Sequence, residues 1–238
     1  MSYNNVIINQ PFGVGDLLWG VSIAHNFVEQ GKGVIWACDP WIAPMAKHFP
    51  RFTLIDRNLL SINVNDRNDV VKNGTRIIPL RFTDSLCQLP YTYCMKSKYI
   101  YVGLNWRDWK DKFHCIRDEA AEKKLYYEVC GLSDGEQYNF VCDLFASNGK
   151  YRIPITEDCD NGLRSVRLSV IPGYTLIDWL MVMERATNIY AVSSSNIYLF
   201  ELFDMQADKI YLYVRRPLEQ NHKNYDYILS KPQYVLMP

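Results

Sequence analysis

The chain has 238 residues, of which 48% are hydrophobic and 22% are charged, a composition typical of a soluble globular protein with one large or two small domains. Its 26 basic and 26 acidic side chains cancel, which argues against nucleic acid as the default partner. Seven cysteines without any C-x-x-C pair favour reduced thiols over a disulfide framework or a zinc site. Because we find neither a signal-peptide pattern nor an apolar run of bilayer length, we expect a cytoplasmic protein without a transmembrane segment.

The first 56 residues alternate between strand-like and helix-like patterns. Residues 5–8 form a buried apolar run, and apolar side chains then recur at helical spacing from Leu17 to Val28. Further β-type runs at 34–38 and 52–56 flank a short helical segment at 41–49. This β-α-β-α-β order predicts a parallel sheet with helices on its faces. The polar residues 57–75 are predicted to form a loop, 76–80 and 98–103 strands, and 117–132 a charged surface helix.

The second half repeats this organisation. Strands are predicted at 138–145, 165–171, 188–192 and 209–214, and a short helix at 196–203. Thr175 and Asp178 have the spacing of a capping box that opens a helix to about residue 186. We therefore expect two Rossmann-like α/β lobes, residues 1–134 and 135–238.

The stretch "PFGVGDLLWG" (11–20) follows the first predicted strand. It begins like a dinucleotide fingerprint, but Leu18 stands at the third glycine position and Asp16 would repel a pyrophosphate. Two interpretations remain for Asp16: an N-cap of the following helix, with Gly13 and Gly15 making the turn, or a general base toward a hydroxyl group.

A second strand-to-helix junction carries no acid. Ser193, Ser194, Ser195 and Asn196 follow a predicted strand and open a helix, so their amides and hydroxyls suit a phosphate or diphosphate. An ordinary serine N-cap is the alternative.

Basic and polar residues upstream of this junction suit the same diphosphate. Ser147, Lys150 and Arg152 follow a predicted strand, although a turn at Asn148-Gly149 with solvated charges explains them equally. Glu201 and Tyr174 are candidates for the ribose or the base, and a surface charge is the alternative for Glu201.

Two weaker candidates complete the set. Asp158 and Asp160 have the D-x-D spacing of metal-dependent sugar transferases, but they lie in an acidic loop where solvated charge is the commoner outcome. Asn105, Trp106 and Arg107 mix an aromatic ring with polar groups, as in sugar or base stacking or in ordinary surface packing.

Three blocks in this order resemble the two-lobed GT-B glycosyltransferases, nearest to the heptosyltransferase-like branch and in a shortened form. The blocks are Gly15-Asp16-Leu17-Leu18, "FVCDLFAS" (140–147) and "PGYTLIDWLMVMERATNIYAVSSS" (172–195). The family's diphosphate loop has aspartate, glycine and histidine where this chain has Ser193–Asn196. A βα unit of the second lobe is missing between 155 and 165.

The resemblance implies two lobes facing a cleft and a sugar nucleotide bound by the second lobe without a metal or another cofactor. It also implies a hydroxyl acceptor, for which a glycan is the natural class, on the side of the first lobe. Asp16 would take the acceptor's proton, with Gly13, Gly15, Asn105, Trp106 and Arg107 on the acceptor side.

Two alternatives stay open. One is a catalytically inactive nucleotide- or glycan-binding α/β module, in which Asp16 only caps a helix. The other is a glycosyltransferase acting on modified DNA bases, which would need a basic groove from Lys96, Lys98, Arg107, Lys110 and Lys112.

Overall fold

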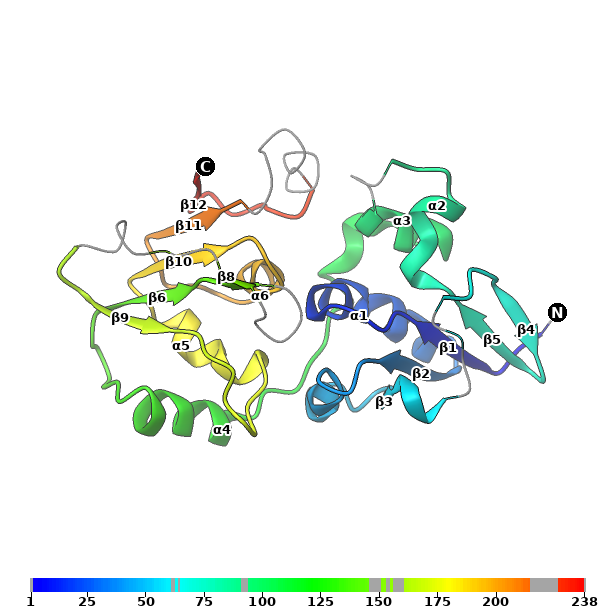
Figure 1. The fold of residues 1–238 in the computed structure, drawn as a ribbon, viewed down its shortest axis with the longest axis horizontal. Coiled ribbons are helices and arrows are strands. Elements are labelled where there is room, and N and C mark those ends of the chain that lie inside the picture. The colour runs from blue at the N-terminus through cyan, green and yellow to red at the C-terminus, as the bar shows by residue number, and fades with distance from the viewer. Residues whose placement is uncertain are drawn as a thin grey trace. The chain divides into compact units, whose positions relative to one another are not determined.

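The structure is a computed structural model that describes residues 2–60, 63, 65–90, 94–145, 151–152, 155, 161–214 and 227–237. The chain divides into two compact units, Met1–Ile116 and Arg117–Pro238 (Figure 1). Each unit has its own largely parallel sheet, as the sequence predicts. The division falls earlier than the predicted boundary at 134, because Arg117 pairs with Glu122 and Glu184 inside the second unit.

The first sheet has the strand order β3-β2-β1-β5-β4. Its strands are β1 (Asn5–Asn9), β2 (Gly33–Cys38), β3 (Thr53–Asp56), β4 (Val70–Lys72) and β5 (Thr75–Ile78). Only β4 is antiparallel, and it contradicts the prediction that 57–75 is entirely a loop. The hairpin turns at Asn73 and Gly74, which both have the positive φ that a two-residue turn requires.

The helices of the first unit pack through aromatic side chains. They are α1 (Val14–Glu29), α2 (Thr83–Leu86), α3 (Cys94–Tyr101) and the 3-10 turns Ala43–His48, Arg57–Leu59, Leu80–Phe82 and Trp106–Trp109. Trp19 of α1 lies against Tyr99 and Trp109, with ring centroids 5.4 and 4.8 Å away. The predicted strand at 98–103 is therefore wrong, because its aromatic residues belong to a helix that packs on α1.

The second sheet has the order β12-β11-β10-β6-β9, with all of its neighbouring strands parallel. Its strands are β6 (Tyr138–Cys142), β9 (Arg164–Arg167), β10 (Asn188–Val192), β11 (Lys209–Tyr213) and β12 (Tyr234–Met237). A short hairpin of β7 (Leu144–Phe145) and β8 (Tyr151–Arg152) follows β6. The sequence interpretation missed β12, since its last predicted strand is 209–214.

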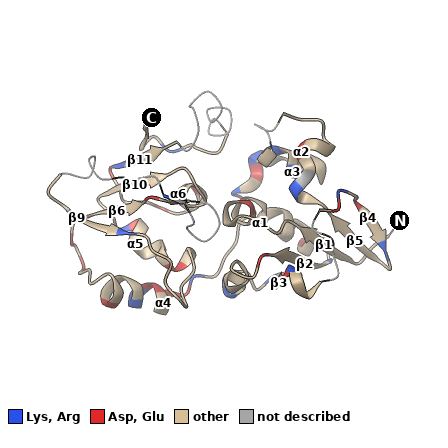
Figure 2. Ribbon diagram, in the orientation of Figure 1, with Lys and Arg blue, Asp and Glu red and all other residues tan. Residues whose placement is uncertain are grey.

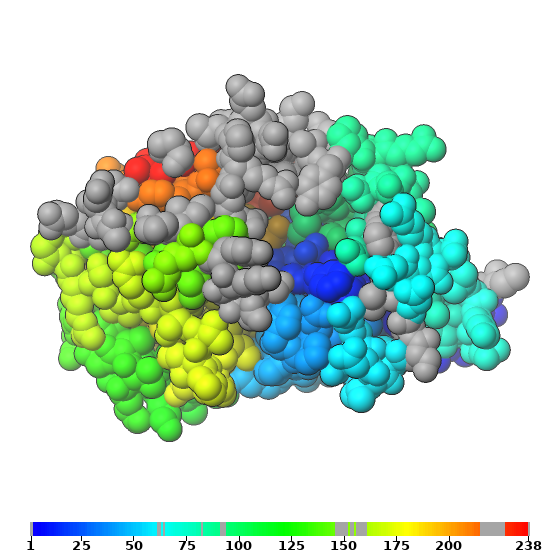
Figure 3. Space-filling model, viewed as in Figure 1, coloured from blue at the N-terminus to red at the C-terminus, as the bar shows by residue number. Residues whose placement is uncertain are grey.

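Helices of the second unit are short. They are α4 (Glu119–Lys124), a π-helical turn (Leu125–Val129), a 3-10 turn (Ile177–Trp179), α5 (Leu180–Glu184) and α6 (Asn196–Leu202). The predicted charged helix at 117–132 is confirmed in α4 and its continuation, which form part of the visible surface in green (Figure 3). Asp178 accepts hydrogen bonds from the backbone and hydroxyl of Thr175, so the two residues close the start of the predicted helix.

The core of the second unit lies on both faces of its sheet. Phe140 packs on Trp179 on one face, while Tyr190 stacks on Tyr211 within a buried cluster that includes Val141. Among the residues that the structure describes, no helix has the length and apolarity needed to cross a bilayer. The six cysteines in those ranges are all free thiols.

Candidate functional site

The strand order places one topological switch point in each unit. In the first sheet the chain runs outward from β1 to β2 and β3 and then returns to β5 on the other side of β1. In the second sheet β9 lies on one side of β6, and β10, β11 and β12 follow on the other. Ligands of open α/β sheets bind outside the carboxyl ends of the strands at such points. The two candidate sites are thus the ends of β1 and β5, and the ends of β6 and β10.

Asp16 lies at the first switch point, in the first turn of α1. The N-cap of this helix is Gly13, with φ 85° and no side-chain capping bond, so the N-cap interpretation of Asp16 is wrong. Asp16 Oδ1 lies 3.1 Å from Lys98 Nζ, and the Asp16 side chain is 30% exposed. Its other oxygen, Oδ2, lies over Gly13, only 2.5 Å from where a Cβ would be. The turn therefore needs glycine at position 13, and it presents a carboxylate held on one oxygen.

Lys98 connects the Asp16 carboxylate, through hydrogen bonds, to the residues that follow β1 and β5. Its buried ammonium also donates to Gln10 Oε1 at 3.0 Å and to the Leu80 carbonyl at 3.1 Å. Gln10 directly follows β1, and Leu80 lies just beyond the end of β5. Three acceptors thus match the three protons of the ammonium. Because Lys98 is buried, it cannot belong to the basic groove that binding to DNA would need. The basic residues of α3, the helix that contains Lys98, are blue in Figure 2.

The other acceptor-side candidates divide between two places. Gly13 and Gly15 belong to the turn that carries Asp16. Asn105 instead caps the 3-10 turn that follows it, accepting from the Arg107 amide. The cations of Lys96 and Arg107 both lie over the Trp106 ring, at 4.3 and 4.4 Å from its centroid. These contacts fit surface packing, and an acceptor role for Asn105, Trp106 and Arg107 stays a prediction.

The serine turn lies at the second switch point, where β10 ends. The Ser193 amide donates to the Tyr213 carbonyl, and the Ser194 hydroxyl donates to the Asn196 side chain. Ser195 is the N-cap of α6, as the ordinary-cap alternative expects, but its side chain makes no capping hydrogen bond. Within the described ranges, the amides of Ser194 and Ser195 have no hydrogen-bond acceptor. Such amides at a strand-to-helix turn are suited to an anion.

Asp143 and Arg167, which the sequence interpretation missed, lie at the same carboxyl edge of the second sheet. Asp143 directly follows β6 and is buried, and its Oδ2 accepts from Arg167 at 3.0 Å. Arg152, a predicted phosphate ligand, reaches the same oxygen at 3.3 Å. Arg167 ends β9 and pairs in register with Val141, so the neighbouring strands bring the two residues together. Predicted strands alone do not reveal this pairing, because it depends on their order in the sheet.

Cys142, the last residue of β6, is buried beneath the same edge. Burial raises the pKa of its thiol to about 12, so the reactive thiolate is disfavoured. We therefore regard Cys142 as a core residue and not as a nucleophile.

Glu201 and Tyr174 have different surroundings. Glu201 is buried, and its two carboxylate oxygens accept from the amide and hydroxyl of Ser230 at 3.1 and 2.7 Å. The surface-charge alternative for Glu201 is therefore wrong, and a ribose would have to compete with Ser230. Tyr174 is half-buried, and its amide closes a turn on Ile171. A role of either residue at the ribose or base stays a prediction.

Some predicted positions lie outside the described residues. They are Ser147, Lys150, Asp158 and Asp160. Within the ranges that are described, no group of three or more His, Cys, Asp or Glu side chains is placed to hold a metal ion.

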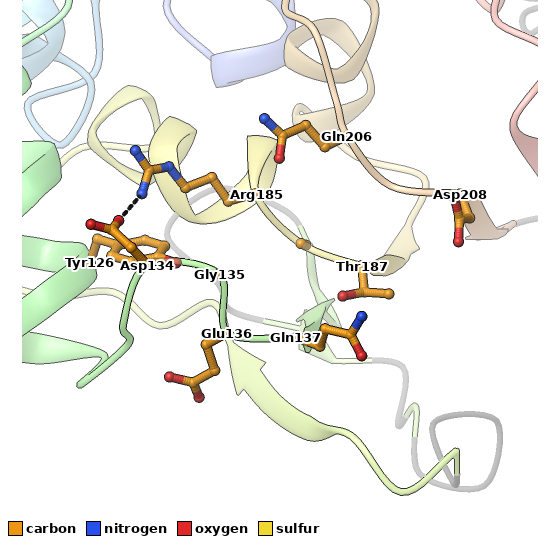
Figure 4. A pocket seen from close by; sticks show the side chains of 10 residues that line it. Tyr126, Asp134, Gly135, Glu136, Gln137, Arg185, Thr187, Gln206 and Asp208 are labelled. Atoms are coloured by element: carbon orange, nitrogen blue, oxygen red, sulfur yellow. Dashed lines mark hydrogen bonds and ion pairs between the residues drawn. The ribbon is translucent and has the colours of Figure 1, made fainter.

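A polar pocket of about 480 Å³ opens at the opposite edge of the second sheet (Figure 4). It lies where β6, β10 and β11 begin, and Arg185 on its wall donates to Asp134 at 2.6 Å. The hydrogen bonds from Tyr127 and Arg185 lower the pKa of Asp134. No predicted site residue lines this pocket, and strand amino ends are not where α/β sheets bind their ligands.

Two α/β units in succession, each with a largely parallel sheet, match a GT-B-like fold. The sequence matches no protein-family model and no curated protein. The fold is similar to a crystal structure of a glycosyl transferase family 9 protein from Veillonella parvula DSM 2008, with a TM-score of 0.54 and 8% identity. That similarity covers 99% of this chain and 86% of the other.

A second similar structure is TibC from enterotoxigenic E. coli H10407, a dodecameric iron-containing glycosyltransferase. Its TM-score is 0.55 at 11% identity, covering 98% of this chain and 62% of TibC. TibC has also been solved as a complex with ADP-D-beta-D-heptose, and that structure has a TM-score of 0.55 at 12% identity, covering 99% of this chain and 63% of TibC. This chain therefore spans less than two thirds of TibC. At these identities the similarity establishes the fold.

Proposed function

We propose that this protein is a metal-independent glycosyltransferase that moves a sugar from a nucleotide-diphospho-sugar to a hydroxyl acceptor, of which a glycan is the natural class. One observation carries the proposal: in a GT-B-like fold, a partly exposed carboxylate, Asp16, stands at the switch point of the first sheet. Catalysis of glycosyl transfer to a hydroxyl requires a base at the acceptor, and a fixed carboxylate is one such group.

Asp16 takes the proton of the acceptor hydroxyl in this proposal. Lys98 holds Oδ1, so that the carboxylate keeps one orientation while the acceptor approaches. The oxygen of the acceptor then forms the new glycosidic bond as the bond between sugar and diphosphate breaks. Fixed positions of base and acceptor lower the entropic part of the barrier.

The second unit binds the sugar nucleotide and its leaving diphosphate. The amides of Ser194 and Ser195, together with Arg152 beside Asp143, would stabilise the charge that develops on the diphosphate. Hydrogen-bond donors and guanidinium groups of this kind take the place that a divalent metal has in D-x-D enzymes. Ser147, Lys150, Glu201 and Tyr174 complete the proposed nucleotide site.

A thermal-shift screen tests the binding part of the proposal. UDP-, GDP-, ADP- and CMP-sugars are added with and without EDTA, starting with ADP-sugars because TibC has been solved with one. A ligand that binds only the folded state raises the melting temperature. We expect one of the diphosphate classes (UDP, GDP or ADP) to do so in the presence of EDTA, whereas CMP-sugars, which carry a single phosphate, provide the contrast. A shift that EDTA abolishes, or none with any nucleotide, contradicts the proposal.

A further inference from the structure

Two arginines meet on one buried carboxylate oxygen at the carboxyl edge of the second sheet. Arg167 Nη1 and Arg152 Nε lie 3.0 and 3.3 Å from Asp143 Oδ2. Arg167 comes from the end of an edge strand and Arg152 from the hairpin after β6, so two separate elements supply these cations. The Asp143 side chain is 2% exposed, whereas those of Arg167 and Arg152 are 40% and 59% exposed.

This cluster has more positive charge than Asp143 needs. One guanidinium neutralises one carboxylate, and the second leaves the group with a net charge of about +1. Two like charges gathered on the same oxygen also repel each other. An anion between the exposed faces of the guanidinium groups would relieve this repulsion.

Among the described residues, only one of the two oxygens of the Asp143 carboxylate has a partner. Asp143 Oδ1 is buried without a hydrogen-bond partner in the part of the chain that the structure describes. A buried carboxylate that uses one oxygen only costs free energy, which a purely structural ion pair would recover with its second oxygen. Arg167 is fixed further by donating Nη2 to the Ile155 carbonyl at 2.9 Å.

We propose that Arg152 and Arg167, oriented by Asp143, form an anion site for a phosphate group of the sugar nucleotide. The identity of the ligand rests on the proposed function, whereas the presence of an anion site rests on the cluster itself. Asp143 is a positioning residue, since it acts through the two guanidinium groups. The remaining N–H groups of the arginines bind the phosphate oxygens in the manner of paired charged hydrogen bonds.

Titration calorimetry with inorganic pyrophosphate tests this site without any sugar or turnover. We expect Arg167→Gln and Arg152→Gln each to weaken pyrophosphate binding about ten- to a hundredfold, the effect of losing a hydrogen bond between charged groups. Arg164→Gln is the matched control, because Arg164 begins the strand that Arg167 ends and pairs instead with Glu136. Circular dichroism and melting temperature establish that each variant is folded.

The pyrophosphate affinity of Asp143→Asn distinguishes a positioning role of Asp143 from a general effect of its negative charge. This variant gains one net positive charge, so a diffuse electrostatic field would bind pyrophosphate more tightly. We expect weaker binding instead, because the guanidinium groups lose their common anchor. Tighter binding overturns the role of Asp143.

The two claims fail in distinguishable ways. Absence of pyrophosphate binding by the wild type, unchanged affinity in both arginine variants, or an equal loss in Arg164→Gln overturns the anion site. Pyrophosphate binding that depends on Arg167, together with absence of sugar transfer, supports the anion site and contradicts the glycosyltransferase. Sugar transfer by the wild type, together with unchanged pyrophosphate affinity in both arginine variants, supports the glycosyltransferase and contradicts the anion site.

Discussion

Lys98 and Asp16 form an ion pair of 3.1 Å in which the lysine side chain is 4% exposed and the aspartate side chain is 30% exposed. The pair is anchored from the interior, through the bonds of Lys98 to Gln10 and Leu80. Solvent reaches the carboxylate and not the ammonium. This asymmetry is what a positioned base requires, because the base must stay in place and remain open to an acceptor.

Replacing Lys98 by methionine removes the ion pair with Asp16 and keeps a side chain of similar length. Lys98→Met leaves the buried acceptors on Gln10 and Leu80 without a donor, so we expect a loss of about 1–3 kcal/mol in the free energy of unfolding. We also expect slower turnover with nearly unchanged nucleotide affinity, since the proposed nucleotide site belongs to the other unit. Urea unfolding and steady-state kinetics measure both effects. Lys96→Met on the same helix is the control, and an equal effect there contradicts the role of Lys98.

Gly13 gives a second test of the same turn. Gly13→Ala places a methyl group at φ 85° and within 2.5 Å of Asp16 Oδ2, so the carboxylate must move. The backbone strain alone costs about 1 kcal/mol or more. The control is Gly31→Ala, which has φ 74° and no atom within 4 Å of the added methyl group. We expect both variants to lose stability and only Gly13→Ala to lose turnover; equal kinetics in the two would refute the proposed need for space beside Asp16.

The buried imidazole of His25 should make the stability of the first unit depend on pH. Its Nδ1 donates to the Lys112 carbonyl at 2.9 Å, and its buried Nε2 has no partner in the described ranges. Burial lowers the pKa of His25, so on acidification the unfolded chain binds a proton before the folded one. Its contribution to stability is thus complete above about pH 6.5 and declines as the pH falls below that value.

The measurement is the free energy of unfolding in urea at about pH 7.5 and about pH 5. We expect wild type to lose more stability between these values than His25→Gln, which keeps a donor for Lys112 but does not titrate. Identical pH dependence of wild type and His25→Gln would show that His25 does not destabilise the protein at low pH.

Arg117 anchors the start of the second unit. Its guanidinium binds Glu122 and, at 2.7 and 2.8 Å, both oxygens of Glu184, and these hydrogen bonds raise the pKa of Arg117. Glu122 is 2% exposed, so Arg117→Met leaves a buried carboxylate uncompensated and should cost about 3–5 kcal/mol. Arg164→Met removes a more exposed pair and should cost about 0–1 kcal/mol. Chemical denaturation compares them, and similar losses would refute the anchoring role.

The sequence predicts most of the parallel strands because each is a short apolar run with turn residues at its ends. It misplaces α3, because Tyr99 and its aromatic neighbours have high strand propensity while their helix depends on contacts with Trp19. It misses β12, whose pairing with β11 is a long-range contact without a local signal. The β4–β5 hairpin does have a local sequence signal, because Asn73-Gly74 is a typical two-residue hairpin turn.

The site is predictable to the extent that its residues are neighbours in sequence. Asp16 and the serine turn each follow a strand, and that context alone marks them as candidates. Lys98 and Arg167 have no such mark, because Lys98 reaches Asp16 from another helix and Arg167 reaches Asp143 from another strand. Strand order and helix packing create these pairs, and neither follows from periodicity.

Release of nucleoside diphosphate from sugar nucleotides in the presence of EDTA tests the central claim most directly. Wild type and Asp16→Asn are compared with added hydroxyl acceptors, and Asp111→Asn serves as a control at an exposed acid. We predict release by wild type and by the control, and a loss of roughly two to four powers of ten in Asp16→Asn with nucleotide binding retained. Absence of release by wild type, or equal rates in wild type and Asp16→Asn, would contradict the account.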